Sequence, residues 1–133
     1  MSVPLLFPVY FEGVTVMIEI SMIDANDFVE QVTLEGDPYK LHFSWNDYSQ
    51  QWTVDVRTMQ NEDIVRGVAV VPNYPLFLQQ KRVASLPRGE LLAIVVDASK
   101  AENQTIGRKS FVDGSFSMVY VPEVEVNAIR DAN

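Results

Sequence analysis

The residue best suited to acid–base chemistry in this chain is its single histidine, His42. An imidazole acts as a catalytic base when it lies within hydrogen-bond reach of a nucleophile and a carboxylate orients it. The candidate nucleophile is Ser44, which follows His42 by two residues in an alternating segment and so lies on the same face. The candidate carboxylate is Asp55, which lies opposite His42 if two such segments pair. Ser44 lies a full strand repeat away, however, and no nucleophile-elbow motif surrounds it. The pattern therefore favours a surface cross-strand pair of His42 with Asp55 and predicts no catalytic role for His42.

The two segments around this pair are expected to form a β-hairpin. Apolar and polar side chains alternate over residues 39–45 and 52–57, and a polar, turn-like stretch separates them. The expected register places Trp45 opposite Trp52, Phe43 opposite Val54, Leu41 opposite Val56, Ser44 opposite Thr53 and Lys40 opposite Arg57. Two exposed tryptophans would make a stacking platform for a sugar or a nucleobase. Since Trp45 and Trp52 share the wholly apolar face, we expect them in the core.

Other candidate sites are weaker. The run Asp24-Ala-Asn26-Asp27 resembles the start of a calcium loop, but the later glycine and the bidentate glutamate are missing, so it predicts an Asx turn. Without cysteine there is no thiolate metal site, and there is no glycine-rich phosphate loop. Paired carboxylates for glycoside hydrolysis stay an open alternative, because acids are plentiful and sequence does not place them in space. We predict no catalytic residue, no metal and no cofactor.

The charge of the chain is unevenly distributed. Lys and Arg number 10 and Asp and Glu 18, which gives a net charge of −8, and residues 1–56 hold nine acids against Lys40 alone. Such a chain is a poor general binder of nucleic acid, because phosphate contacts need Lys and Arg. The asymmetry predicts a negative face, which either serves solubility or docks a basic partner. The basic clusters are either solvated or contact an acidic neighbour; they are Lys81, Arg82 and Arg88, and Arg108 with Lys109.

The remaining segments that must position these residues also read as strands. Six or seven strands are expected in all, from the segments 14–22, 28–34, 39–45, 52–57, 64–71, 90–97 and 115–121. Gly67 marks a possible bulge, residues 76–82 predict one or two helical turns, and the nearly all-apolar 90–97 predicts a central strand buried on both faces. The fold class is therefore mainly all-β, a small antiparallel barrel or sandwich of six to seven strands with one short helical turn. Residues 14–122 form a single domain, and 123–133 a short acidic tail.

Residues 1–13 are expected to form an apolar N-terminal arm. Pro4 and Pro8 exclude a helix interior, so the segment is extended, as a strand added to a sheet edge. Such an apolar run needs a cover, and we favour another subunit over the arm's own domain. Residues 98–110 form a long polar loop of the kind that tends to be functional. Partner contacts are predicted for residues of the arm and of this loop: Leu5, Leu6, Phe7, Tyr10, Phe11, Arg108 and Lys109.

Five segments stand in a familiar order: Met17-Ile-Glu-Ile-Ser21, Asp27-Phe-Val-Glu-Gln-Val-Thr-Leu-Glu-Gly36, Tyr39-Lys-Leu-His-Phe-Ser-Trp-Asn46, Gln51-Trp-Thr-Val-Asp-Val-Arg57 and Ile64-Val-Arg-Gly-Val-Ala-Val-Val-Pro72. Over roughly residues 17–121 the chain resembles the baseplate plug family of contractile-tailed bacteriophages. The spacing of Trp45-Asn46 and Trp52-x-x-Asp55 is the strongest part of the likeness. The arm and the long loop look like additions to the family pattern.

The resemblance implies a small, non-enzymatic structural protein of the virion, in the tail baseplate, that contacts the hub or tube and helps to close or organise the central channel. Its partners would be other baseplate proteins in an oligomeric arrangement, with no small-molecule substrate, no specific nucleic acid and no membrane insertion. No signal peptide is expected, so assembly would take place in the host cytoplasm. The residues alone leave two alternatives: a stand-alone β module that binds a peptide or a glycan, and an enzyme that uses carboxylates.

Overall fold

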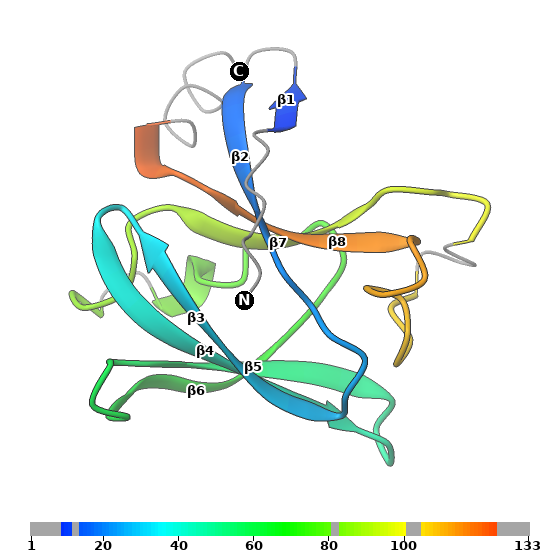
Figure 1. The fold of residues 1–133 in the computed structure, drawn as a ribbon, viewed down its shortest axis with the longest axis horizontal. Coiled ribbons are helices and arrows are strands. Elements are labelled where there is room, and N and C mark those ends of the chain that lie inside the picture. The colour runs from blue at the N-terminus through cyan, green and yellow to red at the C-terminus, as the bar shows by residue number, and fades with distance from the viewer. Residues whose placement is uncertain (1–8, 12–13, 81–82, 101–104, 125–133) are drawn as a thin grey trace.

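The structure, a computed structural model, describes residues 9–11, 14–80, 83–100 and 105–124. These residues contain eight strands and one 3-10 turn (Figure 1). The elements are β1 Val9–Phe11, β2 Val14–Ile20, β3 Asp27–Leu34, β4 Asp37–Asn46, β5 Gln51–Arg57, β6 Asp63–Ala69, η1 Leu78–Gln80, β7 Glu90–Val95 and β8 Phe116–Val121.

The strands form two antiparallel sheets of four strands each. The first sheet has the order β1-β2-β8-β7 and the second the order β3-β4-β5-β6. Figure 1 shows them as two layers, with β7 and β8 above the second sheet. The predicted mainly-β fold is confirmed, as a sandwich rather than a closed barrel. Each of the seven predicted segments contains a strand.

The second sheet follows from its turns and its alternation. Glu35 and Gly36, which join β3 to β4, have φ angles of 56° and 85°, the positive values that a tight type I′ hairpin turn requires. This turn sets Leu34 opposite Asp37. The next hairpin has the predicted register throughout, including His42 opposite Asp55 and Trp45 opposite Trp52.

The predicted bulge at Gly67 is confirmed. Val54 pairs with Val68 and Val56 with Val65, so two residues of β6 lie opposite Asp55. Gly67 has a φ of 64°, which a residue without Cβ adopts at little cost. The bulge turns the Gly67 N–H toward the Asp55 side chain, whose Oδ1 accepts it at 2.7 Å.

The core lies between the two sheets. Alternate residues of each strand point inward, as the strand period of two requires. Fully buried side chains come from both layers: Leu41, Phe43, Val54 and Val56 from the second sheet, and Leu91, Ala93, Met118 and Tyr120 from the first. Phe77, beside η1 in the predicted helical turn, is also fully buried.

The predicted central position of residues 90–97 is wrong, because β7 stands at the end of the first sheet and β8 lies inside it. The segment after β6 partly covers the free edge of β7: the Asn73 N–H donates to the Ala93 carbonyl at 2.7 Å, and the Leu76 N–H to the Leu91 carbonyl at 2.9 Å. The apolar run of β7 reflects apolar packing on both of its faces: Leu91 and Ala93 lie in the core between the sheets, and Leu92 and Ile94 pack against the cluster of Met17, Val119 and Val121.

Part of the expected arm belongs to the first sheet. Its last residues form β1, in which Val9 pairs with Met17 and Phe11 with Val14 of the same chain. Residues 1–8 lie outside the described residues, as do the side chains of Tyr10 and Phe11. The prediction that another subunit covers the apolar side chains of the arm stays a prediction.

Candidate functional site

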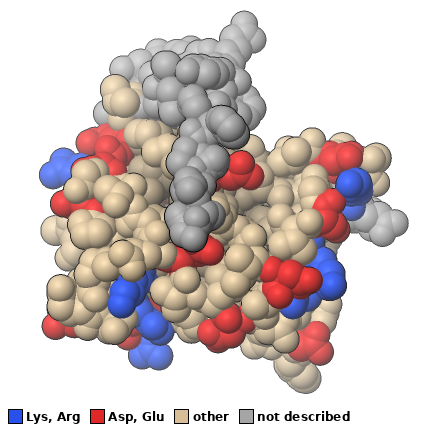
Figure 2. All heavy atoms as spheres, viewed as in Figure 1, with Lys and Arg blue, Asp and Glu red and all other residues tan. Residues whose placement is uncertain are grey.

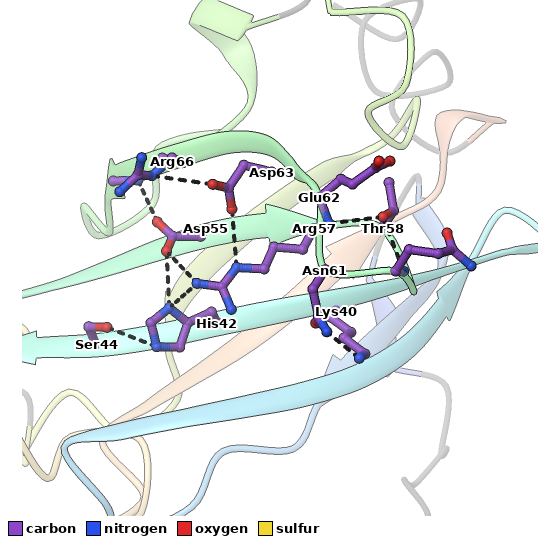
Figure 3. Close-up of polar contacts among 12 residues, drawn as sticks. Lys40, His42, Ser44, Asp55, Arg57, Thr58, Asn61, Glu62, Asp63 and Arg66 are labelled. Atoms are coloured by element: carbon purple, nitrogen blue, oxygen red, sulfur yellow. Dashed lines mark hydrogen bonds and ion pairs between the residues drawn. The ribbon is translucent and has the colours of Figure 1, made fainter.

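The densest group of interacting charged side chains lies on the outer face of the second sheet, the face turned away from the first sheet. His42 is at its centre, on the polar side of β4 (Figure 3). Its Nδ1 lies 3.0 Å from Asp55 Oδ2, and its Nε2 lies 2.8 Å from Asp27 Oδ1. Arg57 contacts both the imidazole, at 3.3 Å, and Asp55, at 3.5 Å, while its Nε donates to Asp63 at 3.1 Å. The predicted pair is thus part of a larger network that joins β3, β4, β5 and β6.

Ser44, His42 and Asp55 are arranged like the nucleophile, the base and the carboxylate of a catalytic triad. Ser44 Oγ lies 3.4 Å from His42 Nε2, on the side of the ring opposite Asp55. Asp27 occupies the same Nε2 at the shorter distance, and the Ser44 hydroxyl donates to Asp27 Oδ2 at 3.2 Å. A base needs a free lone pair toward the hydroxyl. Here a carboxylate holds each ring nitrogen, so the arrangement favours a charged imidazolium over an activated serine.

The pKa shifts follow from these contacts. Partial burial lowers the pKa of His42, but the hydrogen bonds to Asp55 and Asp27 outweigh it and hold the pKa above its ordinary value of 6.5. The hydrogen bond with His42 lowers the pKa of Asp27. Partial burial raises the pKa of Asp55. Its hydrogen bonds to His42 and to the Gly67 N–H outweigh this effect and hold the pKa below its ordinary value of 3.8. The network is therefore a set of mutually stabilised ions.

Sequence reasoning found His42 and Asp55 but missed Asp27. The Glu35–Gly36 turn is the sequence signal that could have found Asp27. A two-residue turn at that point sets the β3–β4 register and places Asp27 opposite Ser44. The predicted juxtaposition of Lys40 and Arg57 is present in the register, but the two cations point to different partners, Asn61 for Lys40 and Asp63 for Arg57. Asp63 thereby compensates the charge of Arg57 beside Lys40.

The two tryptophans are neighbours, as predicted, and Trp52 belongs to the core, whereas Trp45 packs against its edge. The two rings lie 5.6 Å apart, and Trp52 is 2% exposed, whereas Trp45 is half-buried. Trp52 also packs edge-on against Phe111, at 6.4 Å, and its Nε1–H donates to the Gly107 carbonyl at 3.3 Å. The long loop is thereby fastened to the end of the second sheet, and Trp52 offers no platform for a ligand.

The basic residues predicted to contact partners lie in this loop. Arg108 is mostly buried; it donates to Asn26 and, at 2.9 Å, to Asp24 Oδ1. Lys109 is largely exposed and lies 3.5 Å from Asp24 Oδ2. In the run that resembled a calcium loop, Asp24 and Asn26 thus accept hydrogen bonds from a guanidinium. In the described parts of the chain, no cluster of three or more His, Cys, Asp or Glu side chains could hold a metal ion.

These contacts also bear on the predicted negative face. Asp24, in the acidic N-terminal part of the chain, meets bases from the other half. On the face that Figure 2 draws, red and blue side chains are interspersed. Charge separation along the sequence is thus partly cancelled in space.

Two shallow depressions lie on the described surface. One, of about 240 Å³, lies beside Glu19, Met22 and Phe111; the other, of about 390 Å³, lies beside Glu35, Tyr39 and Arg88. His42 lines neither of them. Among the helical segments that the structure describes, none is long and apolar enough to cross a membrane.

The described residues thus form an antiparallel β-sandwich with a network of ion pairs on one outer face. Residues 17–123 match the model of the family described as the cyanophage baseplate Pam3 plug gp18. The chain belongs to this family of bacteriophage baseplate plugs, and the expected structural role in the baseplate is thereby supported. A comparison with curated proteins found no match.

Proposed function

We propose that the protein acts in the virion as a plug that contacts the hub or tube of the tail baseplate and helps to close or organise the central channel. The observation that carries this proposal is the family match, which runs from Met17 to Glu123 and so spans the sandwich except for β1 and the start of β2. The protein is assembled into the tail in the host cytoplasm and forms part of an oligomeric structure. It acts on no small molecule, binds no specific nucleic acid and does not enter a membrane.

The contacts to neighbouring baseplate proteins are made by the arm and by the basic part of the long loop. The proposed contact residues are Leu5, Leu6, Phe7, Tyr10, Phe11, Arg108 and Lys109. Lys109 supports the loop contact, because its side chain is 66% exposed beside Asp24. Rim charges of this kind set the orientation and rate of docking more than its strength.

The role is structural rather than enzymatic. The arrangement at Ser44, His42 and Asp55 supports this reading, because Asp27 takes the ring nitrogen that a serine nucleophile would need. Replacement of the imidazole by an amide should therefore leave assembly intact. We expect phage that carry His42→Gln to form infectious particles at the normal yield, whereas a folded His42→Gln protein that cannot support infection would contradict a structural role.

The direct test is to delete the gene in its phage and supply the protein in trans. We expect mass spectrometry to find the protein in purified tails and electron microscopy to show its density in the baseplate channel. Arg108→Ala with Lys109→Ala should reduce incorporation. A matched control, Lys40→Ala with Arg66→Ala, also removes two positive charges but from the second sheet, and should incorporate normally. A protein that is absent from purified tails, or that binds a glycan or peptide away from them, would overturn the proposal.

A further inference from the structure

Strand β3 is an open edge of the second sheet. It stands at the end of the order β3-β4-β5-β6, and in the described parts of the chain no strand pairs with its other side. It runs without a bulge for 8 residues, from Asp27 to Leu34. Such an edge presents a row of backbone donors and acceptors to any extended chain that meets it.

The backbone groups that face this open side belong to alternate residues. The Trp45 N–H donates to the Asn26 carbonyl at 2.7 Å, so Asn26 and every second residue after it bond to β4. The residues between them turn their N–H and C=O groups away from β4, and they include Val29, Gln31 and Thr33. These three side chains are exposed. The open side of β3 therefore carries regularly spaced backbone groups that an added strand could bond.

The other sheet edges that the structure describes are interrupted, short or covered. Strand β6 has register shifts around the Gly67 bulge, and β1 has only 3 residues. Strand β7 donates no open edge along Leu91 and Ala93, because their carbonyls accept hydrogen bonds from Leu76 and Asn73. Bulges, short strands and covering segments are the features by which proteins block strand addition. Among the described edges, β3 alone lacks all three.

A charged side chain, Glu30, determines which strand this edge accepts. Glu30 lies on the core-facing side of β3, between buried Phe28 and half-buried Val32, and is itself half-buried. Its neighbour on β4 is the uncharged Leu41, and partial burial raises the pKa of the Glu30 carboxyl.

Strand addition would bury this carboxylate further. In an antiparallel pair on the open side, Glu30 occupies a non-hydrogen-bonded position, where facing side chains are closest. An apolar or acidic residue opposite it would leave a buried charge without compensation, whereas Lys or Arg would form a cross-strand ion pair. Glu30 thus disfavours strands that lack a base at this position and favours those that have one.

We propose that the open edge of β3 binds an extended segment of a neighbouring baseplate protein as an added antiparallel strand, with a Lys or Arg of that segment opposite Glu30. This inference names a partner class for the proposed function and rests on it. Charge complementarity supports a basic segment, since residues 27–37 contain no Lys or Arg but four acids: Asp27, Glu30, Glu35 and Asp37. A second copy of the chain suits the edge less well, because two β3 strands would bring these acids together.

The charge is tested with two short synthetic peptides of alternating Thr and Val, in which a central Val is replaced by Arg in one and by Glu in the other. We expect the Arg peptide to bind the full chain at least about tenfold more tightly than the Glu peptide. Its binding should slow amide hydrogen exchange at Val29, Gln31 and Thr33, measured by NMR. Charge reversal by Glu30→Lys should invert the preference between the two peptides.

A proline tests the backbone contacts separately from the charge. The Gln31 N–H is not used in the ladder with β4, so Gln31→Pro is compatible with an edge strand but removes a donor from the open side. We expect Gln31→Pro to lose binding of the Arg peptide and the matched control Gln31→Thr to keep it. The near-ultraviolet signal of buried Trp52 reports that the sandwich stays folded. If the proline unfolds the protein, the inverted preference of Glu30→Lys decides.

Several results of these experiments would overturn the proposal. They are failure of the Arg peptide to bind, equal affinities for the two peptides, and binding that survives Gln31→Pro. Slow exchange at Val29, Gln31 and Thr33 in the free protein would overturn it as well. If that protection rises with protein concentration, a second copy occupies the edge, and if it does not, another part of the same chain does.

The content of purified phage tails separates this inference from the proposed function. We expect wild-type protein and the Gln31→Thr control in the tails, and less of the Gln31→Pro protein. Absence of the wild-type protein from tails would contradict the proposed function itself. Normal incorporation of folded Gln31→Pro protein beside wild type would contradict only the contact at β3.

Discussion

The outer faces of the two sheets differ in kind. The second sheet presents His42, Asp55 and Arg57 to the outside, and its one outward valine, Val29, is half exposed. The first sheet presents Val119 and Val121, which are almost completely buried. One face is satisfied by its own ion pairs and by water, whereas the other requires a further layer of protein. The sandwich thus has one outer face stabilised by ion pairs and another stabilised by apolar packing.

The largest effect is expected at the core that both sheets share. Trp52→Ala should lower the free energy of unfolding by about 3–5 kcal/mol, because a buried aromatic side chain leaves a cavity and the anchor of the long loop is lost. Denaturant unfolding of the purified protein measures this change. This loss of free energy of unfolding is the reference for the substitutions on the outer faces. An unchanged stability would mean that Trp52 does not hold the two layers together.

The same substitution on each outer face compares them directly. Val119→Ala, on the first sheet, should cost about 2 kcal/mol, because two buried carbons are removed and a small cavity remains. Val29→Ala, on the second sheet, should change stability by less than about 0.5 kcal/mol, because that side chain is already half in water. Chemical denaturation of both variants gives the difference. Equal costs would remove the distinction between a covered and an uncovered face.

The smallest effect is expected at the ion network, and it depends on pH. The folded-state pKa of His42 is raised above 6.5, so the charged imidazole stabilises the fold fully below that pH, and the contribution is lost as pH rises through the folded-state value. Asp27 and Asp55 stay ionised across this window, because their pKa values are lowered below 3.8. His42→Gln should therefore destabilise the protein by under about 1 kcal/mol near pH 5.5, and by less near pH 8.5.

Thermal unfolding of wild-type protein and the Gln variant at several pH values measures this difference. Val29→Ala, which removes no titratable group from the same face, is the control and should show no such pH dependence. A gap between wild type and His42→Gln that grows toward high pH would mean that the imidazole is held neutral, and would reopen the question of a catalytic base.

Local patterns in the amino-acid sequence determine much of the second sheet. Alternation over residues 39–45 and 52–57 specifies which side chains share a face, so it predicts Trp45 beside Trp52 and His42 beside Asp55, and both are confirmed. The motifs along the same strands also resemble the baseplate plug family, which the family match confirms. These features depend on neighbours that a short turn brings together, and the information lies in the local sequence.

The tertiary structure alone decided which distant segments meet. The apolar run of β7 predicts burial equally well at the centre or at a covered edge, and only the fold puts β8 inside the sheet and β7 at its end. Arg108 reaches Asp24 across 84 positions, and Tyr120 reaches Glu35 across 85. Alternation tells which way a side chain points, but not what it will face there, because that depends on how the two sheets pack and which strand lies next.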